Sequence, residues 1–172
     1  MRNDLIVRQL LPELKQKKVL EVGCGICTFC NEAAPFVSEI YAIDIENKMQ
    51  YIKKHPNLIF KMMDASKLEF RPMSFDTVVY YNTVGHLERV IGESIDESIR
   101  VLKDDGKLVF CSSMSYDRSV LDKLVTPYLQ KLGLDVKISM YQTMKFVVAS
   151  KKRRLTINYK EMKEKGLIKG AE

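Results

Sequence analysis

The chain has 172 residues, enough for one globular domain that buries a core without metal or disulfide cross-links. Hydrophobic residues make up 46% and charged residues 29%, no apolar run approaches the roughly 20 residues that span a bilayer, and Met1-Arg2-Asn3-Asp4 opens no signal peptide. Because four cysteines do not make a secreted disulfide framework either, these features predict a cytoplasmic protein with no membrane association.

The formal net charge of +6 is confined to one end of the chain. Residues 1–144 carry 19 Lys/Arg and 19 Asp/Glu, whereas residues 145–172 carry 9 and 3, which accounts for the whole excess (9 − 3 = +6). We therefore expect a neutral domain over residues 1–150 and a basic tail over residues 151–172, with a short helix at Asn158–Lys165.

A helical stripe of apolar residues runs from Asp4 to Lys15, with Pro12 expected to kink or end it. Strand-like runs then alternate with helix candidates, which predicts βαβ units and a parallel sheet. The expected strands are Lys18–Val22, Glu39–Ile43, Asn57–Met62, Asp76–Tyr81 and Lys107–Cys111. The expected helices are Thr28–Phe36, Asn47–Lys54, a short one after Asp64, and Gly92–Leu102.

The end of the domain breaks this alternation. A helix over Tyr116–Leu132, stopped by Gly133, precedes two strands, Leu134–Met140 and Met144–Ser150. Three residues between these strands leave no room for a crossover helix, so the pair must be antiparallel. The predicted fold is an α/β, Rossmann-like, doubly wound sheet of seven strands, mostly parallel with an antiparallel hairpin at its C-terminal end.

The stretch Val19-Leu-Glu-Val-Gly-Cys-Gly-Ile-Cys27 carries the first functional signal. A short apolar strand runs into Gly23 and Gly25, and a helix candidate follows. A glycine turn at this place lets backbone N–H groups approach a ligand at a helix N-terminus. The pattern predicts a nucleotide-type site.

With four further motifs in order, the chain resembles a class I S-adenosylmethionine-dependent methyltransferase of type 11 over about residues 17–150. VLEVGCGIC resembles the family's acid followed by Gly-x-Gly-x-Gly, with Cys27 at the third glycine. The other motifs are Ile40-Tyr-Ala-Ile-Asp44, the "DA-x-x-L"-like Met63–Leu68, Phe75–Glu88 with its "FD-x-V" strand and "HH-L"-like turn, and Ile99–Gly106, close to "RVLKPGG".

The resemblance implies S-adenosylmethionine as cofactor, S-adenosylhomocysteine as product, and no metal. Asp44 would bind the ribose hydroxyls, Asp64 the adenine amino group, and the Ala65 N–H a ring nitrogen. The implied cofactor-binding residues are Glu21, Gly23, Cys24, Gly25, Asp44, Ile45, Asp64, Ala65, Tyr80 and Tyr81. Asp44 also fits as the N-cap of the helix expected after it, and Asp64 as the cap of the turn at Ser66; Asp76 is expected to bond backbone near the first loop.

The segment Tyr80–Glu88 lies beside the transferred methyl group in this family. Tyr81, Asn82 and His86 are therefore the candidate catalytic residues for contact with the methyl acceptor. His86 is a candidate general base, because imidazole titrates near neutral pH; a structural loop histidine is the alternative.

Two other site types compete for the glycine loop. A dinucleotide fingerprint needs glycine at position 28, which is Thr28, and a NAD fold would continue with parallel units rather than a hairpin. The Cys24-x-x-Cys27-x-x-Cys30 spacing, with Cys111 as a fourth thiolate, resembles an iron–sulfur run. Its position inside the glycine turn and the following helix argues for core or pocket-lining cysteines instead.

Little sequence is left to enclose a substrate, since about 16 residues precede the first strand. The open site is expected to be covered by a bulky acceptor or by a second subunit, as in a homodimer. A small metabolite is the favoured acceptor; RNA bound through the basic tail, or a protein, is the alternative. A subunit that binds S-adenosylmethionine without turnover is a further alternative.

Overall fold

The computed structural model describes residues 3–151, which form one seven-stranded sheet with the order β3-β2-β1-β4-β5-β7-β6. The α/β fold with a C-terminal antiparallel hairpin is therefore confirmed. The strands are β1 (Lys18–Val22), β2 (Glu39–Asp44), β3 (Leu58–Met62), β4 (Phe75–Tyr81), β5 (Leu102–Ser112), β6 (Asp135–Tyr141) and β7 (Met144–Ser150). The predicted helix at Asn158–Lys165 lies outside the described residues.

The pairing of the strands places the site. β1 pairs in parallel with both β2 and β4, and β4 pairs in parallel with β5. β7 then pairs antiparallel with β5 and β6. The carboxyl ends of β1, β2 and β4 consequently lie at one edge of the sheet, and the chain order reverses between β1 and β4. In open α/β sheets, ligands bind at such a switch point.

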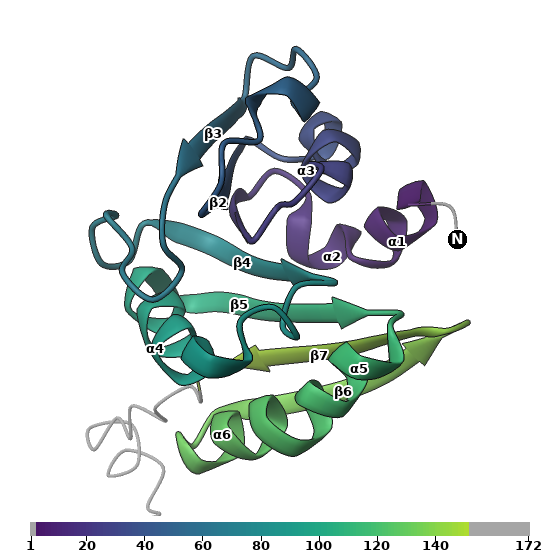
Figure 1. The fold of residues 1–172 in the computed structure, drawn as a ribbon, viewed down its shortest axis with the longest axis vertical. Helices are drawn as coiled ribbons and strands as arrows, with labels where there is room; N and C mark the ends of the chain where they lie inside the picture. The colour runs from purple at the N-terminus through teal and green to yellow at the C-terminus, as the bar shows by residue number, and fades with distance from the viewer. Residues whose placement is uncertain (1–2, 152–172) are drawn as a thin grey trace, which may run out of the picture.

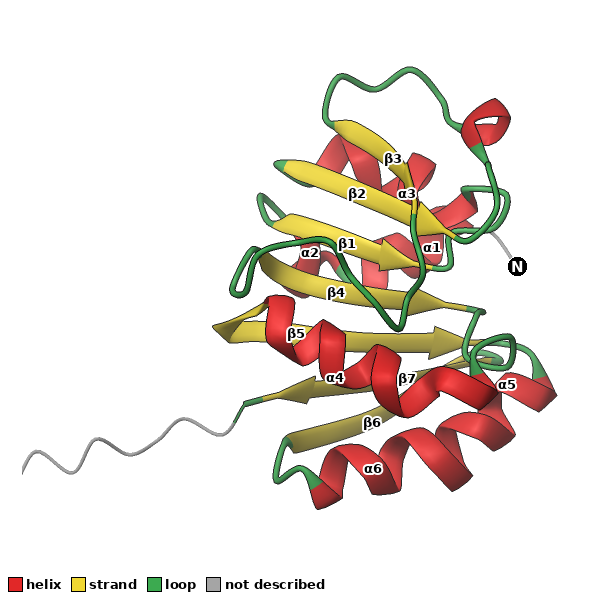
Figure 2. Ribbon diagram, turned by 60° about the vertical axis from the view of Figure 1, so that its left-hand side comes forward, coloured by secondary structure: helices red, strands yellow, loops and turns green. Residues whose placement is uncertain are grey.

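Helices cover both faces of the sheet (Figures 1 and 2). Figure 2 shows α4 (Ile91–Val101), α5 (Ser115–Val120) and α6 (Thr126–Lys131) in front, with α1 (Asn3–Gln9), α2 (Leu11–Leu14) and α3 (Thr28–Ala33) behind. The core is accordingly split into two apolar layers, one on each side of the sheet. No helix of the described part is long and apolar enough to cross a bilayer.

The first helix breaks at its proline, as predicted: α1 ends at Gln9, and α2 carries Pro12 in its first turn. The last helix is less regular than predicted. A π-helical stretch, Leu121–Val125, separates α5 from α6. Pro127, which has no N–H to donate, lies in the first turn of α6 and accounts for the disturbed hydrogen bonding there.

The helix predicted over Asn47–Lys54 is wrong. Only one 3₁₀ turn forms, Met49–Tyr51, and the chain is extended again at Ile52. The buried side chain of Asn31 on α3 explains this, because its amide donates to the Tyr51 carbonyl and accepts from the Lys53 N–H, both at 2.8 Å. These backbone groups are held by a tertiary contact and are not free for a helical ladder.

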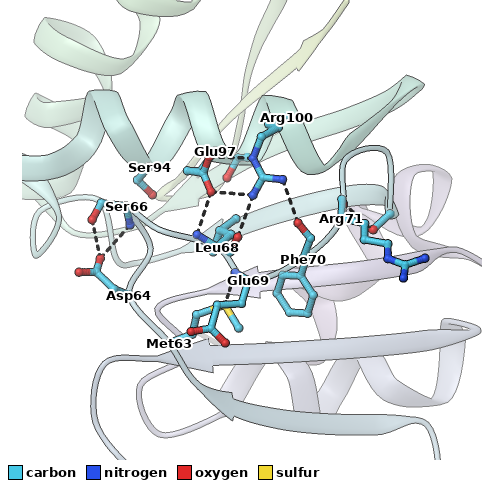
Figure 3. Close-up of polar contacts among 12 residues, drawn as sticks. Met63, Asp64, Ser66, Leu68, Glu69, Phe70, Arg71, Ser94, Glu97 and Arg100 are labelled. Atoms are coloured by element: carbon cyan, nitrogen blue, oxygen red, sulfur yellow. Dashed lines mark hydrogen bonds and ion pairs between the residues drawn. The ribbon is translucent and has the colours of Figure 1, made fainter.

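The short helix predicted after Asp64 is also absent. A turn closes there by a 3.1 Å hydrogen bond from Lys67 N to Asp64 O. The chain then passes over α4, where Arg100 donates to the carbonyl groups of Leu68 and Phe70, each at 2.8 Å (Figure 3). These contacts hold the backbone at Leu68 and Phe70 against α4 in a non-helical path.

Candidate cofactor and acceptor site

A pocket of about 480 Å³ opens at the carboxyl ends of β1, β2 and β4. The ends of these three strands and the loops that follow them line it. Their lining residues include glycines, a cysteine, acidic residues, an asparagine and a histidine. Its volume lies within the range of about 300–1,000 Å³ that is usual for small-molecule sites. The pocket lies at the switch point of the sheet.

The loop after β1 alternates left-handed residues. Gly23, Gly25 and Cys27 have φ values of +68°, +51° and +58°. A Cβ on Gly23 would lie 2.2 Å from Oγ1 of the buried Thr83, which follows β4, whereas a Cβ on Gly25 would meet no atom within 4 Å. Gly23 is therefore required for packing, and Gly25 leaves its backbone open to the pocket. Cys27 takes the same backbone conformation with a side chain, which is rare for a residue other than glycine.

Asp44 ties the loop after β1 to the end of β2. Its Oδ2 accepts a hydrogen bond of 2.9 Å from Gly25 N, and its Oδ1 accepts one of 3.1 Å from Glu46 N. The helix N-cap that was the alternative for Asp44 is not formed, because only the 3₁₀ turn at Met49–Tyr51 follows; the Glu46 contact closes a local turn instead. Each carboxylate oxygen keeps further acceptor capacity, so a ribose hydroxyl can bind to Asp44 without breaking either bond.

Glu21 lies beneath the loop and not in the pocket. It is 1% exposed, and its Oε2 accepts a 3.0 Å hydrogen bond from Cys30 N in the first turn of α3. Burial is the main cause that raises the pKa of Glu21 to about 8, against the lowering effect of the Cys30 contact. Its side chain supports the loop from below by holding α3 to β1.

The β4 side of the pocket holds the three candidate catalytic residues, Tyr81, Asn82 and His86. Asn82 has a φ of +48°, and its Oδ1 accepts hydrogen bonds from Ser112 Oγ at 3.0 Å and Ser113 N at 2.9 Å. The amide nitrogen is therefore the group that Asn82 can offer to a ligand as a donor. The Tyr81 ring stacks on Phe29 of α3 with 5.5 Å between the centroids.

A buried carboxylate positions the loop after β4. Asp117 on α5 is 2% exposed; its Oδ1 accepts a 3.1 Å hydrogen bond from Gly85 N, and its Oδ2 one of 3.2 Å from Ser112 Oγ. Ser112 Oγ also lies 3.0 Å from Asn82 Oδ1, and its single hydroxyl hydrogen serves one of these two acceptors at a time. Asp117 therefore fixes Gly85 directly, and Ser112 links it to Asn82.

Eight of the predicted site residues line the pocket together. They are Gly23, Cys24, Gly25, Asp44, Ile45, Tyr81, Asn82 and His86. The prediction for Tyr80 is corrected: its side chain is 1% exposed on the opposite face of β4, where its hydroxyl bonds Ser94 and Ser98 of α4. Successive side chains of a strand point to opposite faces, so Tyr80 and Tyr81 cannot both face the pocket.

Asp64 and Ala65 lie beside this group and not among its lining residues. The Met63 N–H donates to the Asp44 carbonyl at 2.8 Å, which brings the loop after β3 against the end of β2. Asp64 Oδ1 accepts hydrogen bonds of 2.8 Å from Ser66 N and Ser66 Oγ (Figure 3), and these bonds lower its pKa. This is the cap geometry expected for the turn at Ser66.

Asp76 was expected to bond backbone near the glycine loop, but it does so at the opposite end of β1. Its carboxylate is structural, with Oδ2 accepting a 2.8 Å hydrogen bond from Lys18 N and Oδ1 paired with Lys103 Nζ at 2.7 Å. Lys18 begins β1, whereas the glycine loop follows the other end of that strand. Asp76 therefore secures the sheet at the edge away from the pocket.

Several site residues were missed in the sequence. Thr28 and Thr83 line the pocket, and each lies next to a motif position. Because β1 and β4 pair in parallel, the loops after these two strands lie side by side, and this pairing was the signal that could have identified both threonines. Lys48 also lines the pocket and pairs with Glu46 at 2.7 Å. Asp117 gave no local signal, because its partners are 32 and 5 residues away.

The residues present fit a bound S-adenosylmethionine. The open space at Gly25 accommodates backbone contact with a ligand, and an acid stands at the end of β2. Among the described residues, no group of three or more His, Cys, Asp or Glu side chains is placed to hold a metal ion.

The sheet order, the glycine loop and the acid after β2 define a class I S-adenosylmethionine-dependent methyltransferase domain, with S-adenosylmethionine as its cofactor. Residues 20–110, just over half of the chain, match the type 11 family described as "Methyltransferase domain". The chain belongs to this family.

Solved structures share the fold at low sequence identity. A SAM-dependent methyltransferase from Aquifex aeolicus superposes with a TM-score of 0.70 at 16% identity, covering 85% of this chain and 88% of that one. The N-methyltransferase NodS from Bradyrhizobium japonicum, solved with S-adenosylhomocysteine, gives 0.69 at 17% identity, covering 88% and 86%.

Curated relatives are longer than this chain. The uncharacterized methyltransferase YcgJ of Bacillus subtilis is 26% identical over 117 residues, which cover 64% of this chain and 46% of YcgJ. Probable polyketide synthase 10 of Dictyostelium discoideum is 23% identical over 135 residues, covering 62% of this chain and 5% of that protein. The chain thus spans less than half the length of these relatives.

Proposed function

We propose that the protein transfers a methyl group from S-adenosylmethionine to a small-molecule acceptor bound on the β4 side of the pocket. The observation that carries the proposal is the meeting of the Gly23–Gly25 loop, Asp44 and the segment from Tyr81 to His86 around one cavity of about 480 Å³. The Gly23–Gly25 loop and Asp44 match the cofactor motifs, and the segment from Tyr81 to His86 is left to line the acceptor position.

The charges of the lining support a small acceptor over RNA. The charged lining residues other than histidine are Asp44, Glu46 and Lys48, which together carry a net charge of −1 (1 − 2). The lysine is already paired with Glu46. A polyanion gains its affinity from clusters of unpaired Lys and Arg, and the basic tail from which RNA binding was expected lies outside the described residues.

The relatives point the same way. Probable polyketide synthase 10 is named for the synthesis of polyketides, which are small molecules, and NodS is described as an N-methyltransferase. The first name supports a small acceptor here; the second says only that NodS methylates a nitrogen atom.

In the proposed reaction the residues of the chain mainly bind and orient. S-adenosylmethionine supplies an electrophilic methyl group on a sulfonium, whose leaving group departs neutral. Asp44 and the Gly25 backbone hold the ribose and methionine parts, and Asp64 with the Ala65 N–H would hold the adenine. Tyr81 and the Asn82 amide would align the acceptor, since alignment supplies most of the rate in an in-line displacement.

His86 is the candidate for removing a proton from the acceptor. Its side chain is exposed at the pocket, and its backbone N–H donates to Thr83 O at 3.0 Å, which fixes the loop that carries it. The base role predicts that His86→Ala lowers the methylation rate by about 10²–10⁴-fold and abolishes its pH dependence near neutrality. A rate unchanged across pH 6–9 would remove His86 from the mechanism.

The test separates cofactor binding from transfer. Calorimetry with S-adenosylhomocysteine should give one binding event per chain. Labelled S-adenosylmethionine should then be incubated with the protein and with three separate acceptor pools: a small-molecule filtrate, total RNA and total protein. We expect the label in the filtrate.

Each other outcome has a definite meaning. Label in RNA or protein would overturn the small acceptor and keep the enzyme. Binding without transfer to any pool would favour the non-catalytic binding subunit. Absence of binding would contradict every function proposed for this pocket. Repetition at increasing protein concentration, with the mass followed by light scattering, tests whether a homodimer is needed.

A further inference from the structure

Two thiols of the glycine loop lie against each other. Cys24 Sγ and Cys27 Sγ are 3.7 Å apart, and a 2.8 Å hydrogen bond from Cys27 N to Cys24 O closes the turn between them. Such a four-residue turn keeps its end Cα atoms within about 7 Å, the spacing that a disulfide requires. The sulfurs must close from 3.7 Å to the bonding distance of about 2.05 Å, which moves the turn that carries them.

The two cysteines differ in their surroundings. Cys24 is 6% exposed and lines the pocket, whereas Cys27 is fully buried, with its Sγ 3.7 Å from Gly25 O and 3.8 Å from Lys48 O. Hydrogen bonds from the Cys30 and Cys24 thiols lower the pKa of Cys27 to about 7, while burial raises the pKa of Cys24. Cys27 is therefore the one of the pair that ionises more readily, and Cys24 is the thiol that faces the pocket.

We propose that Cys24 and Cys27 form a reversible redox site within the cofactor loop, oxidised to a disulfide by a small peroxide that enters through the pocket. The third cysteine of the run, Cys30, is not part of the bond. Its Sγ lies 3.5 Å from the carbonyl oxygen of Cys27, and its N–H is held by Glu21.

The reaction balances with hydrogen peroxide as the oxidant. Cys24 lines the pocket and meets the peroxide: the Cys27 thiolate, 3.7 Å away, takes the Cys24 proton, and the Cys24 sulfur attacks one peroxide oxygen, so that the O–O bond breaks and hydroxide leaves, giving a sulfenic acid. The Cys27 sulfur then attacks the Cys24 sulfur, the S–O bond breaks, and water leaves with the Cys27 proton. Overall, two thiols and one peroxide give one disulfide and two waters; a dithiol reductant reverses the bond by exchange.

The disulfide would weaken cofactor binding, because both cysteines flank Gly25, whose N–H bonds Asp44 at 2.9 Å. Drawing the sulfurs together must shift this segment of the pocket wall. We expect S-adenosylhomocysteine to bind the oxidised protein about tenfold more weakly, within the usual range of coupling between sites. By linkage, saturating S-adenosylhomocysteine would then raise the reduction potential of the pair by about 30 mV.

The chemical step is tested without any methyl acceptor, so its failure is distinct from failure of the proposed function. The full chain is reduced, treated with hydrogen peroxide, alkylated and digested with trypsin. Residues 19–48 contain no Lys or Arg before Lys48, so all three loop cysteines fall in one peptide, while Cys111 falls in another. We expect that peptide to lose two hydrogens, with one alkyl group on Cys30, and to regain them after dithiothreitol.

Cys27→Gly and Cys111→Ser complete the design. Glycine suits the left-handed backbone of Cys27, so this variant should fold, and its affinity for S-adenosylhomocysteine should be the same before and after peroxide. Cys111→Ser should form the disulfide as the wild type does. A bond that includes Cys30, sulfinic acid as the main product, or equal affinity of the oxidised and reduced wild type would each overturn the proposal.

Discussion

The Oδ2 atom of Asp44 lies 2.9 Å from the backbone nitrogen of Gly25, across 19 residues of sequence. This hydrogen bond joins the loop after β1 to the end of β2, so the two halves of the cofactor motif form one rigid wall. The oxygens of Asp44 hold the Gly25 and Glu46 N–H groups, and the residue also lines the pocket.

Asp44→Asn should weaken binding of S-adenosylhomocysteine by about 10- to 100-fold. The amide has one acceptor oxygen in place of two and no charge, and hydrogen bonds to a charged group contribute about 1.5–3 kcal/mol. Calorimetry measures the change. Asp135→Asn makes the same substitution at an exposed position at the start of β6 and should bind like the wild type. Equal affinity of both variants would remove Asp44 from the cofactor site.

Gly25→Ala separates backbone strain from ligand contact when it is compared with Gly133→Ala. Both glycines have positive φ, +51° and +75°, and neither would bring a Cβ within 4 Å of another atom. Each variant should lose about 1–2 kcal/mol of unfolding free energy from the left-handed conformation, measured by urea denaturation.

Only Gly25→Ala should lose affinity for S-adenosylhomocysteine, by about tenfold or more (about 1.4 kcal/mol), because its Cβ enters the pocket. Gly133 follows α6, away from the lining residues. An equal loss of affinity in both variants would mean that strain alone weakens binding.

Arg100→Met should destabilise the fold through the loop after β3. The guanidinium donates to the carbonyls of Leu68 and Phe70 and pairs with Glu97, whose Oε2 also accepts from Leu68 N at 2.8 Å (Figure 3). Methionine keeps the aliphatic stem and removes every donor. The Arg100 side chain is 34% exposed, so solvent screens part of the loss, and we expect about 1.5–3 kcal/mol by urea denaturation.

Arg89→Met is the matched control for that substitution. Arg89 is exposed beside the start of α4, and a change at such a surface position should stay within about 0.5 kcal/mol. If both variants unfold at the same urea concentration, the Arg100 contacts do not stabilise the loop.

The sheet was predictable because its strands are short apolar runs separated by turn residues. β1 and β7 have the predicted limits, and β4 begins one residue before its predicted start. The false helix at residues 47–54 arose because the Asn31 contacts that replace it come from α3, more than one element away. No local pattern encodes a side chain that arrives from elsewhere.

In the candidate site, too, the residues marked by local motifs could be predicted, and those that depend on tertiary contacts could not. Motif spacing identified eight residues that the fold brings together, since each lies at the carboxyl end of a parallel strand or in the loop that follows it. The error at Tyr80 was avoidable, because alternation along β4 allows one of two adjacent tyrosines to face the pocket. Asp117 was not predictable, because its role depends on α5 lying against the loop after β4.

Glu21→Gln should change how stability depends on pH. Burial raises the pKa of Glu21 to about 8 from its ordinary value of 4.5, so between these values the folded chain binds a proton that the unfolded chain has released. The free energy of unfolding therefore falls as pH rises from about 5 to 8, by at most about 1.4 kcal/mol per unit for this group. Glutamine has the shape of the protonated acid and cannot ionise, so the variant should lose this slope.

Urea denaturation at pH 5, 6, 7 and 8 measures both slopes. The two proteins should be closest in stability at pH 5 and diverge in favour of Glu21→Gln toward pH 8, where the wild type must deprotonate a carboxyl that is 1% exposed. Glu69→Gln, at an exposed position, should keep the wild-type slope. Parallel curves for the wild type and Glu21→Gln would show that Glu21 is already ionised in the fold, with the Cys30 N–H sufficient to hold its charge.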